Sequence, residues 1–103
     1  MYLREYLGND GRIYFNKVGD KGYGVNMVLE SVLKSIVLSV ETTETCICRG
    51  VAEQIRDLIN KYDGTRWNVF CSAAGTLSVS VFPKYGRYAY IKPKNCYYVL
   101  YMA

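Results

Sequence analysis

The sequence predicts a single α+β domain over residues 1–103: one strand, two consecutive helices and then a four-stranded antiparallel sheet. Half of the residues are apolar and about a fifth are charged, which is typical of one folded globular domain. Apolar residues recur at helical spacing between Asn26 and Gly64. After Gly64 they alternate with polar residues at the two-residue period of strands.

The N-terminal segment is expected to contain the strand that precedes the helices. Residues 8–11 carry a strong turn signal, Gly-Asn-Asp-Gly, between two short runs rich in apolar residues. Residues 1–11 therefore form an extra N-terminal strand or arm, and Arg12 to Phe15 form the first strand of the domain. Residues 19–25 contain several glycines and are expected to be a flexible connector to the first helix.

Two amphipathic helices are predicted next. Asn26 can cap the first helix, and Thr43 or Thr45 can cap the second, which ends at Asp63 and Gly64. The residues that share one face of each helix are Val28, Leu29, Val32, Leu33, Ile36 and Val40 in the first and Val51, Ile55, Leu58, Ile59 and Tyr62 in the second.

Four strands are predicted after Gly64, at residues 67–72, 76–82, 87–91 and 96–102. Their connections are short, which favours antiparallel pairing between successive strands. The strand from Thr76 to Val81 has no Lys, Glu or Pro, the residues that usually protect an edge strand from pairing with other chains. This strand is therefore either central in the sheet or open to a partner strand.

The chain contains no histidine, which removes the usual general base and the commonest metal ligand. We therefore expect no enzyme, no catalytic residue and no cofactor. The cysteines at positions 46, 48, 71 and 96 lack the paired spacing of structural zinc sites, so we expect no metal and four reduced, mostly buried thiols. No apolar run is long enough for a membrane span and no signal peptide is recognisable, which predicts a cytoplasmic protein without membrane contact.

Positive charge is concentrated in the C-terminal part. Residues 64–103 contain no acidic residue and five basic ones, Arg66, Lys84, Arg87, Lys92 and Lys94. Such a field suits acidic peptides or phosphates, and it is equally compatible with ordinary solvated strand faces. Together with exposed tyrosines, it makes a small basic nucleic-acid-binding protein the alternative function.

Several motifs accompany this order of elements. The second helix contains Val51-Ala52-x-x-Ile55 and closes with Lys61-Tyr62-Asp63-Gly64, Trp67 opens the next strand, Gly75-Thr76-Leu77-Ser78 leads another, and Tyr88-Ala89-Tyr90-Ile91 precedes the run from Cys96 to Tyr101. Over roughly residues 12–103 the chain resembles the smallest, dimeric class of dynein light chain. The resemblance implies a non-catalytic subunit of a motor complex at microtubules, located in the cytoplasm and cytoskeleton or in the axoneme of a cilium.

The resemblance also implies a site. Two copies, or one copy and a related light chain, would form a dimer in which each subunit lends strand 76–82 to the sheet of its partner. An extended segment of another protein, such as a dynein intermediate chain, would then bind by strand addition. The implied groove residues are Asn16, Arg49, Gly50, Val51, Gly75, Thr76, Leu77, Ser78, Val79, Ser80, Tyr88 and Tyr90, and the implied dimer interface contains Trp67, Asn68, Val79 and Val81.

Overall fold

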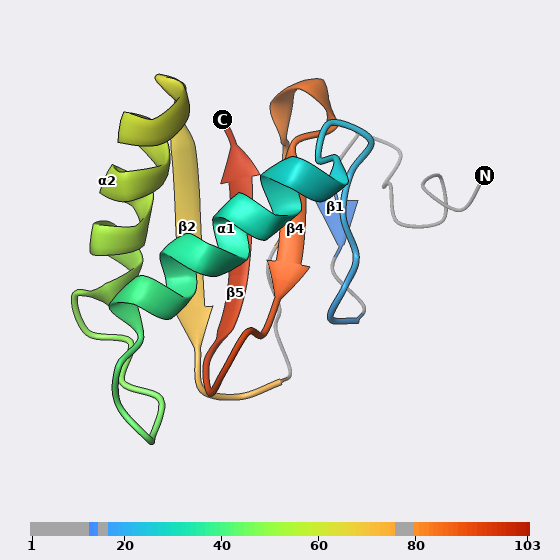
Figure 1. The fold of residues 1–103 in the computed structure, drawn as a ribbon. Coiled ribbons are helices and arrows are strands. Elements are labelled where there is room, and N and C mark those ends of the chain that lie inside the picture. Colours follow the sequence, from blue (N-terminus) through green and yellow to red (C-terminus); the bar gives the residue numbers. More distant parts are fainter. Residues whose placement is uncertain (1–12, 15–16, 76–79) are drawn as a thin grey trace.

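A computed structural model describes residues 13–14, 17–75 and 80–103. The α+β fold predicted from the sequence is confirmed, with two helices packed on an antiparallel sheet (Figure 1). The elements in chain order are β1 (Ile13–Tyr14), α1 (Met27–Val40), α2 (Val51–Asp63), β2 (Trp67–Ser72), β3 (Ser80–Val81), β4 (Tyr88–Ile91) and β5 (Tyr97–Met102).

The main sheet has three described strands in the order β2-β5-β4, both pairs antiparallel. The central strand β5 buries Tyr98, Val99 and Leu100 completely, as expected for a strand covered on both faces. Pairing between successive strands, predicted from the short connections, is confirmed for β4 and β5. Within the described residues β2 pairs with β5, which the short connections do not predict, because β5 is buried on both faces and takes the central place. Whether β2 also pairs with residues 76–79 lies outside the described part of the chain.

The four-stranded sheet predicted from the sequence is seen only in part. Of the strand expected at residues 76–82, Ser80 and Val81 form β3, which pairs antiparallel with β1 in a separate two-stranded sheet. Residues 76–79, and with them the expected lending of this strand to a partner subunit, lie outside the described part of the chain.

Only α1 begins with the cap that the sequence predicts. The Asn26 side chain caps α1 by accepting the Leu29 N–H at 2.8 Å, as predicted. For α2 the predicted threonine caps are wrong: Gly50, in the left-handed conformation, precedes the helix instead. Thr43 bonds within the preceding loop, because its hydroxyl donates to the Thr45 carbonyl. None of the described helices is long and apolar enough to cross a membrane.

The helices cover one face of the sheet and create the main core. Figure 1 shows α1 crossing the strands obliquely while α2 runs alongside β2. The apolar face predicted for α1 is correct at Leu33 but not at Val28, which is 68% exposed because it lies near the start of the helix. The buried core residues on this side of the sheet are Val25, Leu33, Val37, Ile55, Ile59, Trp67, Ala89, Ile91, Cys96, Tyr98 and Leu100.

Residues 19–22 close the outer edge of β4 by backbone hydrogen bonds, so the prediction that residues 19–25 form a flexible connector is wrong for this part of the segment. The N–H groups of Gly19 and Gly22 donate to the carbonyls of Tyr90 and Tyr88 at 2.7 and 3.0 Å, and the Tyr90 N–H donates to the Asp20 carbonyl at 2.8 Å. A Cβ atom at Gly22 would lie 1.9 Å from the Gly86 carbonyl oxygen, so only glycine allows this approach. The segment 19–22 is thus an ordered backbone strip along β4.

Candidate functional site

The opposite edge of the sheet, along β2, is open within the described part of the chain. In antiparallel sheets successive residues bond alternately to the two sides of a strand. The Ala103 N–H donates to the Arg66 carbonyl at 2.9 Å, which fixes this alternation for β2. The backbone groups of Val69 and Cys71 therefore face away from β5. No described residue forms a hydrogen bond with them, whereas the outward N–H of Trp67 is satisfied by the Asn60 side chain at 2.7 Å.

The side chains of β2 do not protect this edge. The strand reads Trp-Asn-Val-Phe-Cys-Ser and contains no charged residue and no proline. Phe70 is 42% exposed and stacks on Tyr101 of β5, with ring centroids 6.0 Å apart. A six-residue uncharged edge strand with outward backbone groups is a suitable template for a further strand.

Two of the predicted groove residues meet where β2 ends. The Tyr90 hydroxyl donates to the Gly75 carbonyl at 3.1 Å, and the ring of Tyr97 lies where a Cβ of Gly75 would be. Tyr88 and Tyr90 are buried, and with Val81 and Val99 they form a second apolar cluster. Gly75 is therefore held against Tyr90 and Tyr97, and the expected role of Tyr88 and Tyr90 as the floor of a groove stays a prediction.

Burial raises the pKa of Tyr90 above its usual value near 10, and the charges at Tyr97 and Asp20 add to the effect. Because the folded-state pKa is raised, the stability gained from the neutral phenol is present below pH 10 and is lost as the pH rises through the folded-state value. We expect the native protein to be more stable than Tyr90→Phe by about 1 kcal/mol at pH 8, and the difference to shrink above pH 10. Urea unfolding at several pH values measures this, and a pH-independent difference would contradict it. Tyr62→Phe, at an exposed side chain, is the control.

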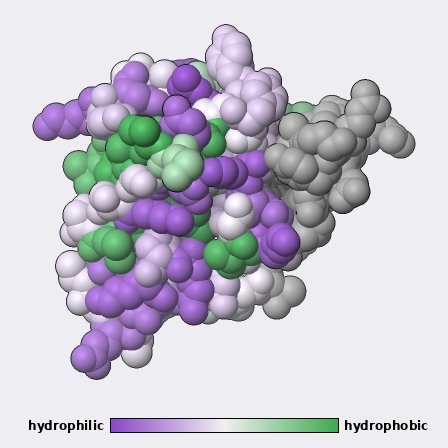
Figure 2. Space-filling model, turned by 45° about the vertical axis from the view of Figure 1, so that its right-hand side comes forward, coloured by the Kyte–Doolittle hydropathy of each residue, from purple (hydrophilic) through white to green (hydrophobic). Residues whose placement is uncertain are grey.

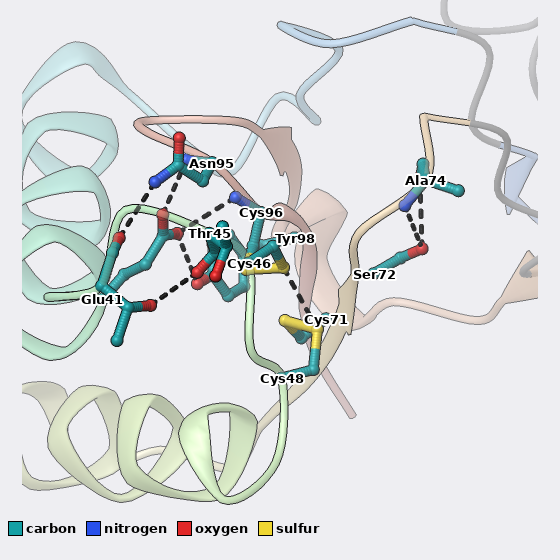
Figure 3. The surroundings of a disulfide bond; sticks show 11 residues. Glu41, Thr45, Cys46, Cys48, Cys71, Ser72, Ala74, Asn95, Cys96 and Tyr98 are labelled. Atoms are coloured by element: carbon teal, nitrogen blue, oxygen red, sulfur yellow. Dashed lines mark hydrogen bonds between the residues drawn. A yellow bond between two sulfur atoms is a disulfide. The ribbon is translucent and has the colours of Figure 1, made fainter.

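A disulfide links the start of α2 to β2 at the same end of the sheet. Cys48 is bonded to Cys71 of β2, and Cys46 is bonded to Cys96, which immediately precedes β5 (Figure 3). The expectation of four reduced thiols is therefore wrong, because the fold brings together cysteines that are far apart in sequence. The Cys48–Cys71 bond fastens the segment directly before Arg49 to the strand that leads to Gly75. The residues that the start of α2 is predicted to contribute to the groove are thus held at the same end of the sheet as Gly75.

Glu41 anchors the loop that carries Cys46 and Cys48. Its side chain is 3% exposed and accepts the N–H groups of Asn95 and Cys96 at 2.6 and 3.2 Å and the Tyr98 hydroxyl at 2.7 Å (Figure 3). Burial is the main cause that raises the pKa of Tyr98 above its usual value, and the hydrogen bond to Glu41 adds to the effect. The phenol therefore stays protonated and can donate to Glu41. A second link joins the same segments, because the Asn95 amide donates to the Thr43 carbonyl at 3.0 Å.

The other residues predicted for the site lie away from the Gly75–Tyr90 contact or outside the residues that the structure describes. Trp67 is buried in the core, where its indole N–H donates to Asp63 at 3.1 Å, and Asn68 is half-buried beside it. Val81 is buried between the two sheets. Arg49 and Val51 line a small pocket of about 120 Å³ at the loop before α2, next to Gly50. Outside the described residues lie Asn16, Thr76, Leu77, Ser78 and Val79, and the Ser80 side chain is not described.

In the view of Figure 2, the helical side of the molecule shows no binding surface comparable to the edge of β2. Apolar side chains there form small groups separated by polar ones. The exposed apolar residues of the helices are Met27 and Val28 at the start of α1, Leu38 near its end, and Leu58 and Tyr62 in α2. Scattered apolar side chains are normal for a protein surface and do not identify a binding site.

No family model matches the chain, and no curated protein matches it significantly. The candidate site is therefore defined by its geometry: the open edge of β2, the Gly75–Tyr90 contact at the end of that edge, and the disulfide-linked loop before α2.

Proposed function

We propose that the protein is a non-catalytic subunit, similar to a dynein light chain, that dimerises and binds extended segments of partner proteins by strand addition. In this proposal the first strand to join β2 is strand 76–82 of a second copy or of a related light chain. A segment of a partner such as a dynein intermediate chain then extends the sheet. The protein would act as an assembly subunit of a microtubule motor complex in the cytoplasm or the axoneme.

The observation that carries this proposal is the outer edge of β2, which pairs with no described strand and carries no charged side chain or proline. Backbone groups that lack partners at a sheet edge gain hydrogen bonds when another strand joins, and apolar neighbours such as Phe70 add buried area. The loop before α2 lies at the end of this strand, where Cys48 adjoins Cys71, which supports a groove between the helix and the added strand.

The contacts of the basic residues weaken the case for the nucleic-acid alternative. Arg87 lies 3.8 Å from the Asp63 carboxylate, and the Lys92 ammonium lies 5.2 Å from the centre of the Tyr97 ring. Part of the C-terminal positive charge is thus already engaged within the molecule. Binding to a single-stranded oligonucleotide would fall steeply with added salt, whereas strand addition depends on backbone hydrogen bonds and changes little.

The proposal is tested by sedimentation equilibrium of Val69→Pro and Val69→Thr. Proline removes an outward N–H that does not bond to β5, so the internal sheet is kept while strand addition is blocked. We expect the dimer of Val69→Pro to dissociate at least about tenfold more readily than the native dimer. Val69→Thr keeps the N–H and has nearly the same shape, so it is the matched control and should dimerise normally.

Two results would contradict the proposal. If the native chain is monomeric at every concentration reached, the dimer does not exist. If Val69→Pro dimerises as tightly as Val69→Thr, the interface is not at β2. Circular dichroism of both variants confirms that they fold.

A further inference from the structure

Four sulfur atoms from three separate segments meet at one end of the sheet. Cys46 and Cys48 come from the loop between the helices, Cys71 from β2, and Cys96 from the turn before β5. All four Sγ atoms lie within 4.8 Å of one another, and those of Cys46 and Cys48, which belong to different disulfides, are 3.6 Å apart (Figure 3). The two disulfides are therefore neighbours in one four-sulfur cluster.

The cluster is held together by contacts other than the disulfides. Glu41, at the start of the loop, accepts hydrogen bonds from the backbone of Asn95 and Cys96, on the other side of the cluster. The Asn95 side-chain amide also donates a hydrogen bond to the Thr43 carbonyl. The Cys48 carbonyl accepts the Val51 N–H at 3.0 Å, which fixes Cys48 against the first turn of α2. These bonds, together with the pairing of Cys71 with Tyr98 in the sheet, join the segments that carry the four cysteines independently of the disulfides.

Four cysteine sulfurs at such distances match the ligand set of a tetrahedral zinc site. Zinc–thiolate bonds of about 2.3 Å place tetrahedral sulfur ligands about 3.8 Å apart. The separation of Cys46 and Cys48 is already close to this value, and each disulfide pair has only to open from bonding distance. Three of the sulfurs belong to half-buried cysteines, so a metal ion can enter from solvent, while buried Cys96 closes the inner side.

We infer that the reduced form of this cluster binds one Zn²⁺ ion, or a similar thiophilic divalent cation, through Cys46, Cys48, Cys71 and Cys96. Two equivalents of a dithiol reductant supply four electrons and four protons, which convert the two disulfides to four thiols while each dithiol becomes a disulfide. Metal binding then releases the four thiol protons as the four Zn–S bonds form. The disulfide form and the metal form exclude each other, so the redox state of the compartment selects between them.

The test uses the full chain, reduced with a dithiol and freed of reductant without oxygen. Co²⁺ is titrated in as a spectroscopic probe and then displaced with Zn²⁺. We expect one Co²⁺ per chain with the intense absorption of a tetrahedral thiolate complex, loss of this absorption on addition of Zn²⁺, and one zinc per chain in native mass spectrometry.

A variant with two ligands removed makes the test specific. Cys48→Ala/Cys71→Ala retains the other two cysteines and is expected to bind Co²⁺ at least about a hundredfold more weakly than the native chain. Ser72→Ala, next to Cys71 but without a thiol, is the matched control and should bind normally. Circular dichroism of each reduced protein, with and without Zn²⁺, reports whether the fold persists.

Three outcomes would overturn the inference. The reduced native chain could remain folded and take up no metal, or it could unfold and stay unfolded when Zn²⁺ is added. The double variant could also bind Co²⁺ as tightly as the native chain. The first two results exclude a metal-binding form of the cluster, and the third places the metal elsewhere.

Discussion

Replacing Glu41 by alanine is expected to lower the free energy of unfolding by about 3–5 kcal/mol. The substitution removes a buried carboxylate and leaves two backbone N–H groups and the Tyr98 hydroxyl without their acceptor. A buried donor that loses its partner costs about 1–3 kcal/mol, and three donors lose theirs together. Glu41→Gln keeps one of the two acceptor oxygens, so its loss of stability should be intermediate.

Urea unfolding of the oxidised protein measures these differences. Glu44→Ala is the matched control, because Glu44 is an exposed acidic residue in the same loop and its removal should change stability by no more than about 0.5 kcal/mol. Equal stability of the Glu41 and Glu44 variants would show that the carboxylate does not hold the loop to the turn before β5.

Removing the Cys46–Cys96 disulfide is expected to cost about 4 kcal/mol, and removing Cys48–Cys71 about 3 kcal/mol. The first bond joins residues 50 positions apart and the second joins residues 23 apart, so the longer loop restricts the unfolded chain more. The paired variants are Cys46→Ala/Cys96→Ala and Cys48→Ala/Cys71→Ala, unfolded in urea without metal or reductant.

The two effects are not expected to add in a variant without any cysteine. The shorter loop lies entirely within the longer one, so each cross-link already restricts part of the chain that the other restricts. The reverse order of the two losses, or a fully reduced chain as stable as the oxidised one, would contradict the loop argument.

The helices were predicted well because their signals are local. Helical spacing of apolar residues, the Asn26 cap and the glycine that ends α2 all act within a few residues. The prediction of the α2 start was wrong because the loop before it is shaped by the disulfide and by Glu41. Those contacts reach residues about 50 positions away in sequence.

Strand positions could also be read from the sequence, but of the strand partners only the β4–β5 pair could. Period-two alternation located β2, β4 and β5, because it depends only on neighbouring residues. The pairing of β2 with β5 depends on which strand can be buried on both faces. The bonding of residues 19–22 to β4 depends on the close approach of Gly22 to Gly86. From composition alone, the glycines of this segment predict flexibility instead.

The candidate site was predictable only in part for the same reason. Gly75 and Tyr90 were expected near each other and are joined by a hydrogen bond. The open edge at β2 and the cysteine cluster were missed, because both arise from tertiary pairing. Glu41 had one weak signal in the sequence: it is a carboxylate directly after an apolar helix, where a negative charge opposes the helix dipole and therefore needs other partners.

The backbone strip along β4 determines which edge of the main sheet is open to another chain. In the part of the chain that the structure describes, residues 19–22 occupy one side of the sheet and leave only the side at β2 available. A sheet that is open at both edges can be extended repeatedly into a filament. In the proposed dimer, strand addition to the main sheet is therefore confined to the edge of β2. The close approach of Gly22 to Gly86, which permits the strip, thus protects the edge of β4 from pairing with other chains.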